Sequence, residues 1–215
     1  MNLLQLDASP RLGRSNSRRL GNYFVERWLA KRPDDRVVHR DLRTFTPPHV
    51  TESWIAAAFT PAAERDDAMH RELAVSDTLV DELEAADVLV MALPMYNFGL
   101  PSALKAWVDN IVRIGRTFDF DPDAADPYTP LLRDKQAYVI VATGDAGYQP
   151  GGPMYGLNHV EPHLRTLFQF IGIDQTTFFY VGNDEFGGQR LETELATATD
   201  RITQTLSSTP SRACA

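Results

Sequence analysis

The chain has 215 residues, of which 43% are hydrophobic and 23% charged, the balance of a globular domain. Its formal net charge of −8 argues against a nucleic-acid-binding protein, which would usually be basic. No apolar run approaches the roughly 18 residues of a membrane span, and the polar turn at Asp7 comes too early for a signal peptide. The single cysteine, Cys214, excludes an internal disulfide and a cysteine-based metal site, so we expect a cytoplasmic protein.

Five short apolar runs, rich in β-branched and aromatic residues, predict β-strands. Two of them, VLVMAL and AYVIVAT, are almost continuously apolar, which is typical of strands buried on both faces of a sheet. The five expected strands are Asn2–Asp7, Val37–Asp41, Val88–Leu93, Ala137–Thr143 and Thr176–Val181.

Segments with helical spacing of apolar residues alternate with these strands. They are Ser17–Lys31, Arg65–Ala86, Ser102–Ile114, His159–Ile171 and Gln189–Leu206. Such alternation predicts an α/β three-layer sandwich, a parallel sheet with helices on both faces. With five strands the natural order is 2-1-3-4-5, and a ligand then binds beyond the carboxyl ends of strands 1 and 3.

We expect a single domain over residues 1–206, followed by a flexible polar tail over residues 207–215. Three segments are longer than ordinary connections: Thr44–Glu64, Phe118–Arg133 and Asp145–Gly156. Long loops in compact domains are usually functional or disordered.

The loop after the first strand contains Ser9 and the cluster Ser15, Asn16 and Ser17, all residue types that cap helices. Hydroxyl groups and free backbone N–H groups at a helix N-terminus form a site for a phosphate. Arg11, Arg14, Arg18 and Arg19 could add a local positive patch or simply form a solvated helix start. Neither G-x-x-x-x-G-K-[ST] nor G-x-G-x-x-G is present, so the loop predicts a monophosphate site.

The loop after the third strand reads Pro94-Met95-Tyr96-Asn97-Phe98-Gly99. Met95, Tyr96 and Phe98 can supply walls for a large flat ligand, and Asn97 and backbone N–H groups can bond its heteroatoms. The alternative is a rigid turn with its aromatic side chains in the core. The loop after the fourth strand, Thr143-Gly144-Asp145-Ala146-Gly147, allows a close backbone approach to a ligand.

These residues together resemble the FMN-dependent NADH-azoreductases, also called FMN-dependent NADH:quinone oxidoreductases, of flavodoxin-like fold. The resemblance extends from the first strand to about Leu206. It depends most on Ser9, the Ser15-Asn16-Ser17 cluster and the Met-Tyr-Asn-Phe stretch. It also includes Asn22-Tyr23-Phe24-Val25-Glu26, Thr117-Phe118 and the Phe-x-Phe-Ile-Gly-Ile run that begins at Phe168.

The resemblance implies a cofactor site for FMN, with NADH or NADPH as co-substrate and a quinone or azo compound as acceptor. Ser9, Ser15, Asn16 and Ser17 would hold the FMN phosphate. Residues beside the isoalloxazine ring would be Met95, Tyr96, Asn97, Phe98, Thr143, Gly144, Asp145 and Gly147. The sequence departs from the family in the last loop, where Gly144 replaces an arginine and Asp145 a glycine.

The family is homodimeric, with its active site at the subunit interface. Phe118 and Phe120 are therefore candidates for walls of the acceptor pocket, or alternatively for dimer or core packing. A flavin carries the redox chemistry itself, so no catalytic side chain is expected, and a ping-pong cycle is the hypothesis. The alternative from another class is a flavodoxin-like electron carrier or flavin-binding module without nicotinamide-dependent catalysis.

Two further patterns partly resemble metal sites, but no metal is expected. His159 and His163 could share a helix face, but a third ligand and an H-E-x-x-H pattern are missing. Asp119, Asp121 and Asp123 resemble the start of a calcium loop, which lacks its glycine and its terminal glutamate. No G-x-S-x-G elbow supports hydrolase chemistry.

Overall fold

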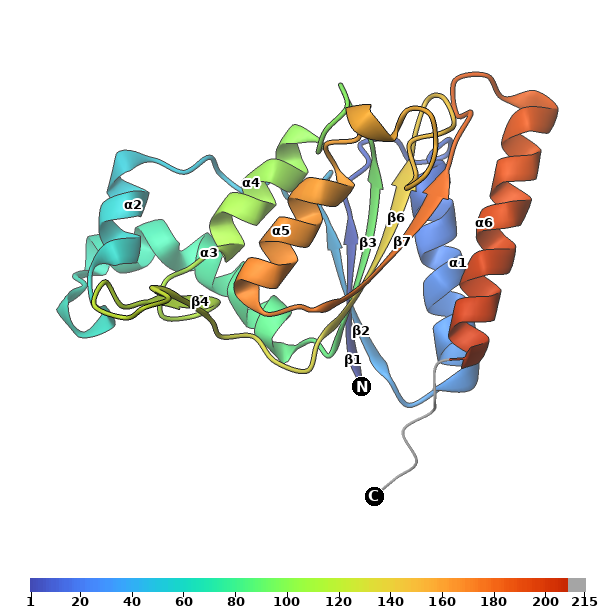
Figure 1. Cartoon of the computed structure of the whole chain (residues 1–215). Coiled ribbons are helices and arrows are strands. Elements are labelled where there is room, and N and C mark those ends of the chain that lie inside the picture. The colour runs from blue at the N-terminus through green and yellow to red at the C-terminus, as the bar shows by residue number, and fades with distance from the viewer. Residues whose placement is uncertain (209–215) are drawn as a thin grey trace.

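A five-stranded parallel sheet forms the centre of the computed structural model, which describes residues 1–208 (Figure 1). Its strands are β1 (Asn2–Asp7), β2 (Arg36–Asp41), β3 (Val88–Pro94), β6 (Gln136–Ala142) and β7 (Gln175–Val181). They lie in the order β2-β1-β3-β6-β7, and all four pairings are parallel. This confirms the predicted order 2-1-3-4-5, counted over the strands of the main sheet.

Helices cover both faces of the sheet, which makes the predicted three-layer sandwich (Figure 1). Helices α1 (Asn16–Lys31) and α6 (Gly188–Ser208) pack on one face, against alternate residues such as Leu3 and Val90. Helices α3 (Asp67–Ala85), α4 (Ser102–Ile111) and α5 (Glu161–Ile171) pack on the other, against Leu4 and Met91. Successive side chains of a strand point to opposite faces, so strands covered on both sides must be apolar at nearly every position.

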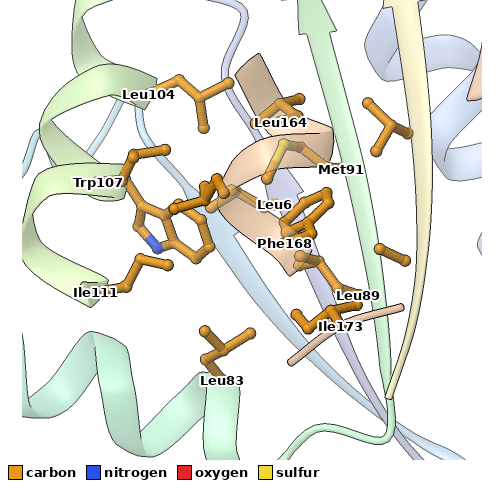
Figure 2. Close-up of a cluster of buried hydrophobic side chains, with 14 of the residues drawn as sticks. Leu6, Leu83, Leu89, Met91, Leu104, Trp107, Ile111, Leu164, Phe168 and Ile173 are labelled. Carbon is orange, nitrogen blue, oxygen red and sulfur yellow. The ribbon is translucent and has the colours of Figure 1, made fainter. Parts of the chain in front are cut away.

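The larger core lies between the sheet and the helices α3, α4 and α5 (Figure 2). Trp107 of α4 and Phe168 of α5 are fully buried there among leucine and isoleucine side chains from the sheet and helices. Burial of aromatic side chains of this size is a dominant stabilising contribution to a domain.

The structure corrects several element boundaries. The expected loop Thr44–Glu64 contains α2 (Glu52–Phe59) and the short 3-10 helix η1 (Ala62–Glu64). Trp54 and Ala57 of α2 pack on Leu73 of α3, so this segment is ordered by its own apolar stripe. A two-stranded antiparallel hairpin, β4 (Phe118–Phe120) with β5 (Tyr128–Pro130), lies within the expected loop Phe118–Arg133. The 3-10 helix η2 (Tyr155–Leu157) begins within the expected loop Asp145–Gly156.

Helix α6 continues to Ser208, two residues beyond the expected end of the domain. The remaining positions of the expected tail, with Cys214, lie outside the described residues. Within residues 1–208, no helix is both long enough and apolar enough to cross a membrane.

Replacing Gly172 by alanine is expected to destabilise the protein by more than about 1 kcal/mol. Gly172 ends α5 with φ +96, and its N–H donates to the carbonyl of Phe168 at 2.9 Å. A Cβ atom at this position would lie 2.2 Å from the backbone oxygen of Leu132. Urea unfolding of the variant measures the loss.

Gly156→Ala is the matched control, because a Cβ atom there would have no other atom within 4 Å and the backbone is not left-handed. We expect a change within about 0.5 kcal/mol there. Equal stabilities of the two variants would contradict the role assigned to the helix end.

Candidate functional site

The loops after β1, β3 and β6 meet at the carboxyl edge of the sheet around a cavity of about 70 Å³. The strand register brings them together, since Asp7 at the end of β1 pairs with Ala92 of β3, and Pro94 at the end of β3 pairs with Ala142 of β6. The cavity is lined by Ser9, Arg11, Arg14, Ser15, Asn16, Ser17, Pro94, Met95, Tyr96, Ala142, Thr143, Gly144, Asp184 and Glu185. Its volume suits a phosphate-sized group and is far below the roughly 300 Å³ of a site that encloses a drug-sized ligand.

Hydroxyl groups line the inner end of this cavity at the start of α1. Ser15 is the N-cap, and its Oγ accepts the backbone N–H of Arg18 at 3.3 Å. Ser17 Oγ lies 3.2 Å from Ser15 Oγ, and Ser9 Oγ accepts the N–H of Arg11 at 3.3 Å. The first N–H groups of a helix have no acceptor within the helix, so they add donors beside these hydroxyls. The set fits an anion at the positive end of the helix dipole.

The segment after β3 forms a tight turn rather than a packed loop. The N–H of Tyr96 donates to the carbonyl of Gly99 at 3.1 Å, and the reverse bond is 3.0 Å. Between them Asn97 and Phe98 have φ values of +48 and +68, which are uncommon for residues with a side chain, above all a bulky aromatic one. Phe98 is 47% exposed, so the turn presents an aromatic ring to solvent at the rim of the site. Backbone strain of this kind is concentrated at functional sites.

The predicted cofactor residues divide into two groups. Ser9, Ser15, Asn16, Ser17, Met95, Tyr96, Thr143 and Gly144 all line the same cavity. The others, Asn97, Phe98, Asp145 and Gly147, belong to the same loops but do not line it. Gly147 is left-handed, with φ +92, and Pro153 covers the place of a Cβ atom there.

Asp184 and Glu185, which follow β7, also line the cavity and were missed by the sequence analysis. Their N–H groups donate to the carbonyls of Thr143 and Gly144, each at 3.1 Å. Asp184 accepts hydrogen bonds from Asn16 and from Arg11, the latter at 3.2 Å. The side chain of Glu185 lies over Gly144, and a Cβ atom there would lie 2.6 Å from the Glu185 carboxyl carbon. The signal was available, since β7 ends at the same edge of the sheet.

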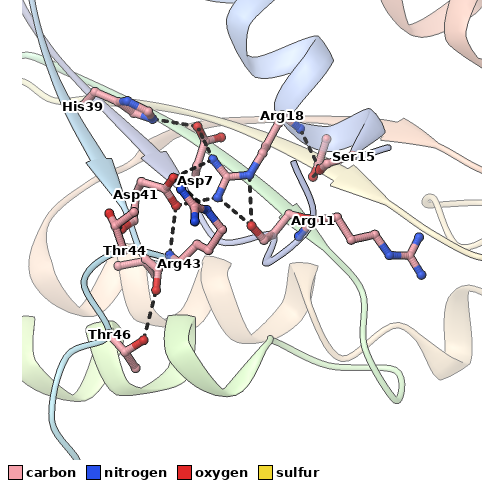
Figure 3. Close-up of polar contacts among 12 residues, drawn as sticks. Asp7, Arg11, Ser15, Arg18, His39, Asp41, Arg43, Thr44 and Thr46 are labelled. Atoms are coloured by element: carbon pink, nitrogen blue, oxygen red, sulfur yellow. Dashed lines mark hydrogen bonds and ion pairs between the residues drawn. The ribbon is translucent and has the colours of Figure 1, made fainter. Parts of the chain in front are cut away.

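A buried polar cluster lies directly beneath the loop after β1 (Figure 3). Arg18 pairs with Asp41 and with Asp7, the latter at 3.3 Å, and His39 Nε2 lies 2.7 Å from Asp7 Oδ2. Burial raises the pKa of Asp7 above 3.8, although the hydrogen bond to His39 and the charge of Arg18 act to lower it. For Asp41, burial is outweighed by hydrogen bonds from Arg18 and from the backbone of Arg43, and its pKa is lowered.

The raised pKa of Asp7 predicts a pH-dependent difference in stability between a parent protein that carries His39→Gln and the same parent with Asp7→Asn. The His39→Gln change removes the imidazole, so that it does not contribute. The folded state binds the proton of Asp7 more tightly than the unfolded state, so the stability from Asp7 is present below pH 3.8 and is lost as pH rises. We expect urea unfolding at a series of pH values from 7 down to about 4 to show the parent gaining stability relative to Asp7→Asn as the pH falls.

Asp41→Asn in the same background is the matched control. The pKa of Asp41 is lowered from its ordinary value of 3.8. The stability that Asp41 contributes is therefore lost only as the pH falls below that value, outside this pH window. The stability difference caused by Asp41→Asn should therefore stay constant between pH 7 and pH 5. If the parent instead loses stability relative to Asp7→Asn as the pH falls, the pKa of Asp7 is lowered in the folded protein and not raised.

Phe118 and Phe120 lie apart from the cavity within one chain. They belong to the β4–β5 hairpin, where Phe118 contacts Phe170 near the far end of α5, with ring centroids 4.9 Å apart. Figure 1 shows β4 well away from the loops at the carboxyl ends of β3 and β6. Phe118 is buried, whereas Phe120 is 41% exposed. Neither lines the cavity.

The two histidines do not share a helix face, contrary to what their spacing predicts, because α5 begins at Glu161 and His159 precedes it. The side chain of Asn158 accepts the N–H groups of Val160 and Glu161 and so starts the helix. Over the described part of the chain, the structure assembles no group of three or more His, Cys, Asp or Glu side chains that could hold a metal.

Comparison with known proteins places this arrangement in a family. A family described as having a flavodoxin-like fold matches residues 1–206. An FMN-dependent NAD(P)H:quinone oxidoreductase of Pseudomonas aeruginosa is 45% identical over 202 residues, covering 93% of this chain and 95% of the relative. An FMN-dependent NADH:quinone oxidoreductase of Pseudomonas fluorescens is 43% identical over the same shares.

Among solved structures, an azoreductase from Bacillus anthracis superposes with a TM-score of 0.85 at 20% identity, covering 96% of this chain and 98% of that one. This likeness supports the fold, whereas the similarity in sequence identifies the family. The chain belongs to the flavodoxin-like family, and within it to the FMN-dependent NADH:quinone oxidoreductases.

Proposed function

We propose that this protein transfers hydride from NADH or NADPH, through bound FMN, to quinones or azo compounds. The observation that carries the proposal is the cavity in which the hydroxyls of the β1 loop meet the β3 turn and the β6 loop. The names of the two relatives from Pseudomonas, both FMN-dependent quinone oxidoreductases, agree with it. FMN, when bound, supplies the hydride chemistry, and the protein supplies position and electrostatics.

The phosphate of FMN fits the hydroxyl end of the cavity, where Ser9, Ser15, Asn16 and Ser17 would hold it. Three observations support this assignment. The cavity has the size of a phosphate group, and α1 begins beside it with its free N–H groups. Each serine hydroxyl lies within 3.3 Å of another serine hydroxyl or of a backbone nitrogen. Arg11 and Arg14 line the cavity, and their positive charge is offset by the carboxylates of Asp184 and Glu185 in the same lining, Asp184 through an ion pair with Arg11. The phosphate assignment therefore depends on the hydroxyls and the helix start and not on a net positive charge.

The ring of FMN would lie outside this small cavity, along the β3 turn and the β6 loop. Met95 and Tyr96 line the adjoining wall, and Phe98 is held outward by its left-handed backbone. Asn97, Thr143, Gly144, Asp145 and Gly147 would border the ring through side-chain and backbone polar groups. Stacking on the flat flavin ring would depend on the shape of an acceptor more than on its functional groups, so many planar acceptors should react.

The proposal includes a ping-pong order, in which the nicotinamide leaves before the acceptor takes the same place. Initial rates at several fixed acceptor concentrations should then give parallel double-reciprocal lines. Intersecting lines would count against a shared place.

The proposal also includes a homodimer, in which Phe120 of one subunit reaches the site of the other, while Phe118 is buried in its own chain against Phe170. Apolar surface supports it: Phe120, Tyr128 and Leu131 are 41%, 48% and 38% exposed. A groove of about 560 Å³ adjoins them and is lined in part by Val108, Leu167 and Phe170. Light scattering on a sizing column measures the mass of the particle.

We place the protein in the cytoplasm, which agrees with its single cysteine.

An anaerobic titration of the FMN-loaded protein tests the function. NADH is expected to bleach the absorbance band of oxidised flavin, and a quinone added afterwards is expected to restore it. Failure to retain FMN would overturn the proposal. Retained FMN that neither NADH nor NADPH bleaches would indicate a flavodoxin-like electron carrier instead.

A further inference from the structure

Arg18 is buried although it lies in the first turn of a helix, where arginine side chains usually extend into water. Only 9% of its side chain is exposed. Its guanidinium turns back beneath the loop after β1, and Nε and Nη2 both donate to the backbone carbonyl of Ser9, at 3.0 and 2.6 Å. Figure 3 shows it between this loop and the two aspartates. Arg18 therefore neither forms a solvated helix start nor adds to the lining of the cavity.

The opposite side of the guanidinium is held by two carboxylates from neighbouring strands. Asp7 ends β1 and Asp41 ends β2, and both pair with Arg18. Nη1 donates to Asp41 Oδ2 at 3.1 Å, and Nη2 donates to Asp41 Oδ1. Two carboxylates around one guanidinium leave no surplus positive charge, so Arg18 cannot act mainly by attracting an anion. Its effect is to fix geometry.

The geometry that it fixes is that of Ser9. This residue is 2% exposed and lines the cavity, and its Oγ accepts the N–H of Arg11. A buried carbonyl without a partner costs free energy, so the loop keeps the conformation in which Ser9 O meets Arg18. Only arginine presents donors in a rigid planar fork that can serve a carbonyl and a carboxylate at once, whereas lysine offers a point charge.

We propose that Arg18 is a positioning residue that sets the loop from Ser9 to Ser17 for the phosphate of FMN, acting through the Ser9 carbonyl. The inference rests on the proposed function, because it takes the phosphate to bind at this loop. It predicts that the loss of Arg18 weakens the phosphate contribution to binding and leaves the ring contribution in place.

The test compares FMN with riboflavin, which lacks the phosphate. Affinities of the apoprotein for both are measured by quenching of flavin fluorescence, in the wild type and in Arg18→Lys, which keeps the charge and loses the fork. We expect the Kd for FMN to rise at least about tenfold and the Kd for riboflavin to change less than about twofold, since hydrogen bonds to a charged group are among the strong ones. Equal weakening for both flavins would overturn the inference.

Arg113→Lys is the matched control. Arg113 is also a buried arginine, 1% exposed, with an ion pair to Asp77 at 3.0 Å and a hydrogen bond to Ser76, and it lies beyond the end of α4. Arg113→Lys should lower the melting temperature and leave the ratio of the Kd values for FMN and riboflavin unchanged. If it changes this ratio as Arg18→Lys does, the change in FMN binding results from a general loss of stability, and the inference fails.

A second variant and the wild type distinguish the remaining outcomes. Should Arg18→Lys fail to fold, Asp41→Asn removes a carboxylate from the same guanidinium and is expected to weaken FMN selectively by a smaller factor. A wild-type protein that binds FMN no better than riboflavin would overturn the assignment of the phosphate site in the proposed function, and the inference with it. Preference of the wild type for FMN combined with an unchanged preference in both variants would overturn the inference alone.

Discussion

A glutamate in place of Ser17 is expected to abolish the retention of FMN. Ser17 is 1% exposed, and it lines the cavity with its Oγ 3.2 Å from that of Ser15. A carboxylate there would face the phosphate, and like charges at such a distance cost several kcal/mol. The Kd for FMN should therefore rise by about 100-fold or more, because each 1.4 kcal/mol is a factor of ten.

Ser17→Gln separates the effect of charge from that of size, because the glutamine side chain has nearly the same shape as glutamate and carries no charge. Binding of FMN by both apoproteins is measured by fluorescence quenching, beside their thermal unfolding. Ser17 is 1% exposed, so either larger side chain must displace its neighbours, and the unfolding curves show whether each variant folds. We expect Ser17→Gln to lose less FMN affinity than Ser17→Glu. The phosphate assignment fails if Ser17→Glu folds and binds FMN as tightly as the wild type.

Trp107→Ala is expected to cause the largest loss of stability, about 3–5 kcal/mol. Trp107 is fully buried in the core between the sheet and the helices α3, α4 and α5 (Figure 2). Truncation leaves a cavity that close-packed neighbours can fill only in part. Such a loss is a large fraction of the roughly 5–15 kcal/mol by which domains are stable. The midpoint of urea unfolding measures it.

Trp107→Phe is the control for this prediction. The indole N–H is buried and has no hydrogen-bond partner among the described residues, so phenylalanine removes an unsatisfied donor while filling part of the space. We expect it to cost clearly less than alanine. Similar losses in the two variants would show that the neighbours do not pack around the ring as described.

The sheet was predictable because its strands are buried on both faces. A run such as VLVMAL has apolar residues at every position, and only a central parallel strand requires that pattern. The order of the strands was the one expected of a doubly wound sheet with five strands. The helix α2 was missed because Pro47, Pro48 and Pro61 around it indicate a loop, whereas its helix is stabilised by contacts with α3 that are distant in sequence.

The location of the site was likewise predictable, since the sheet order alone selects the carboxyl edge and the loops that reach it. The serine cluster and the Met-Tyr-Asn-Phe stretch supplied the chemistry. The pattern of turn residues could not show that Asn97 and Phe98 would both be left-handed, because that conformation is imposed by the bonds between Tyr96 and Gly99.

Periodicity and helix-capping chemistry are local properties of the chain, so they were enough to predict the fold, the edge of the sheet that holds the site and the serine loop. The end of β7 at that edge pointed to the loop of Asp184 and Glu185, but their contacts with the cavity required the tertiary structure. The inward turn of Arg18 to Ser9 and the position of Phe120 away from the cavity required it as well. These outcomes depend on pairings between residues far apart in the chain. Such pairings follow from how layers pack and where burial leaves a polar group in need of a partner, and no local pattern records them.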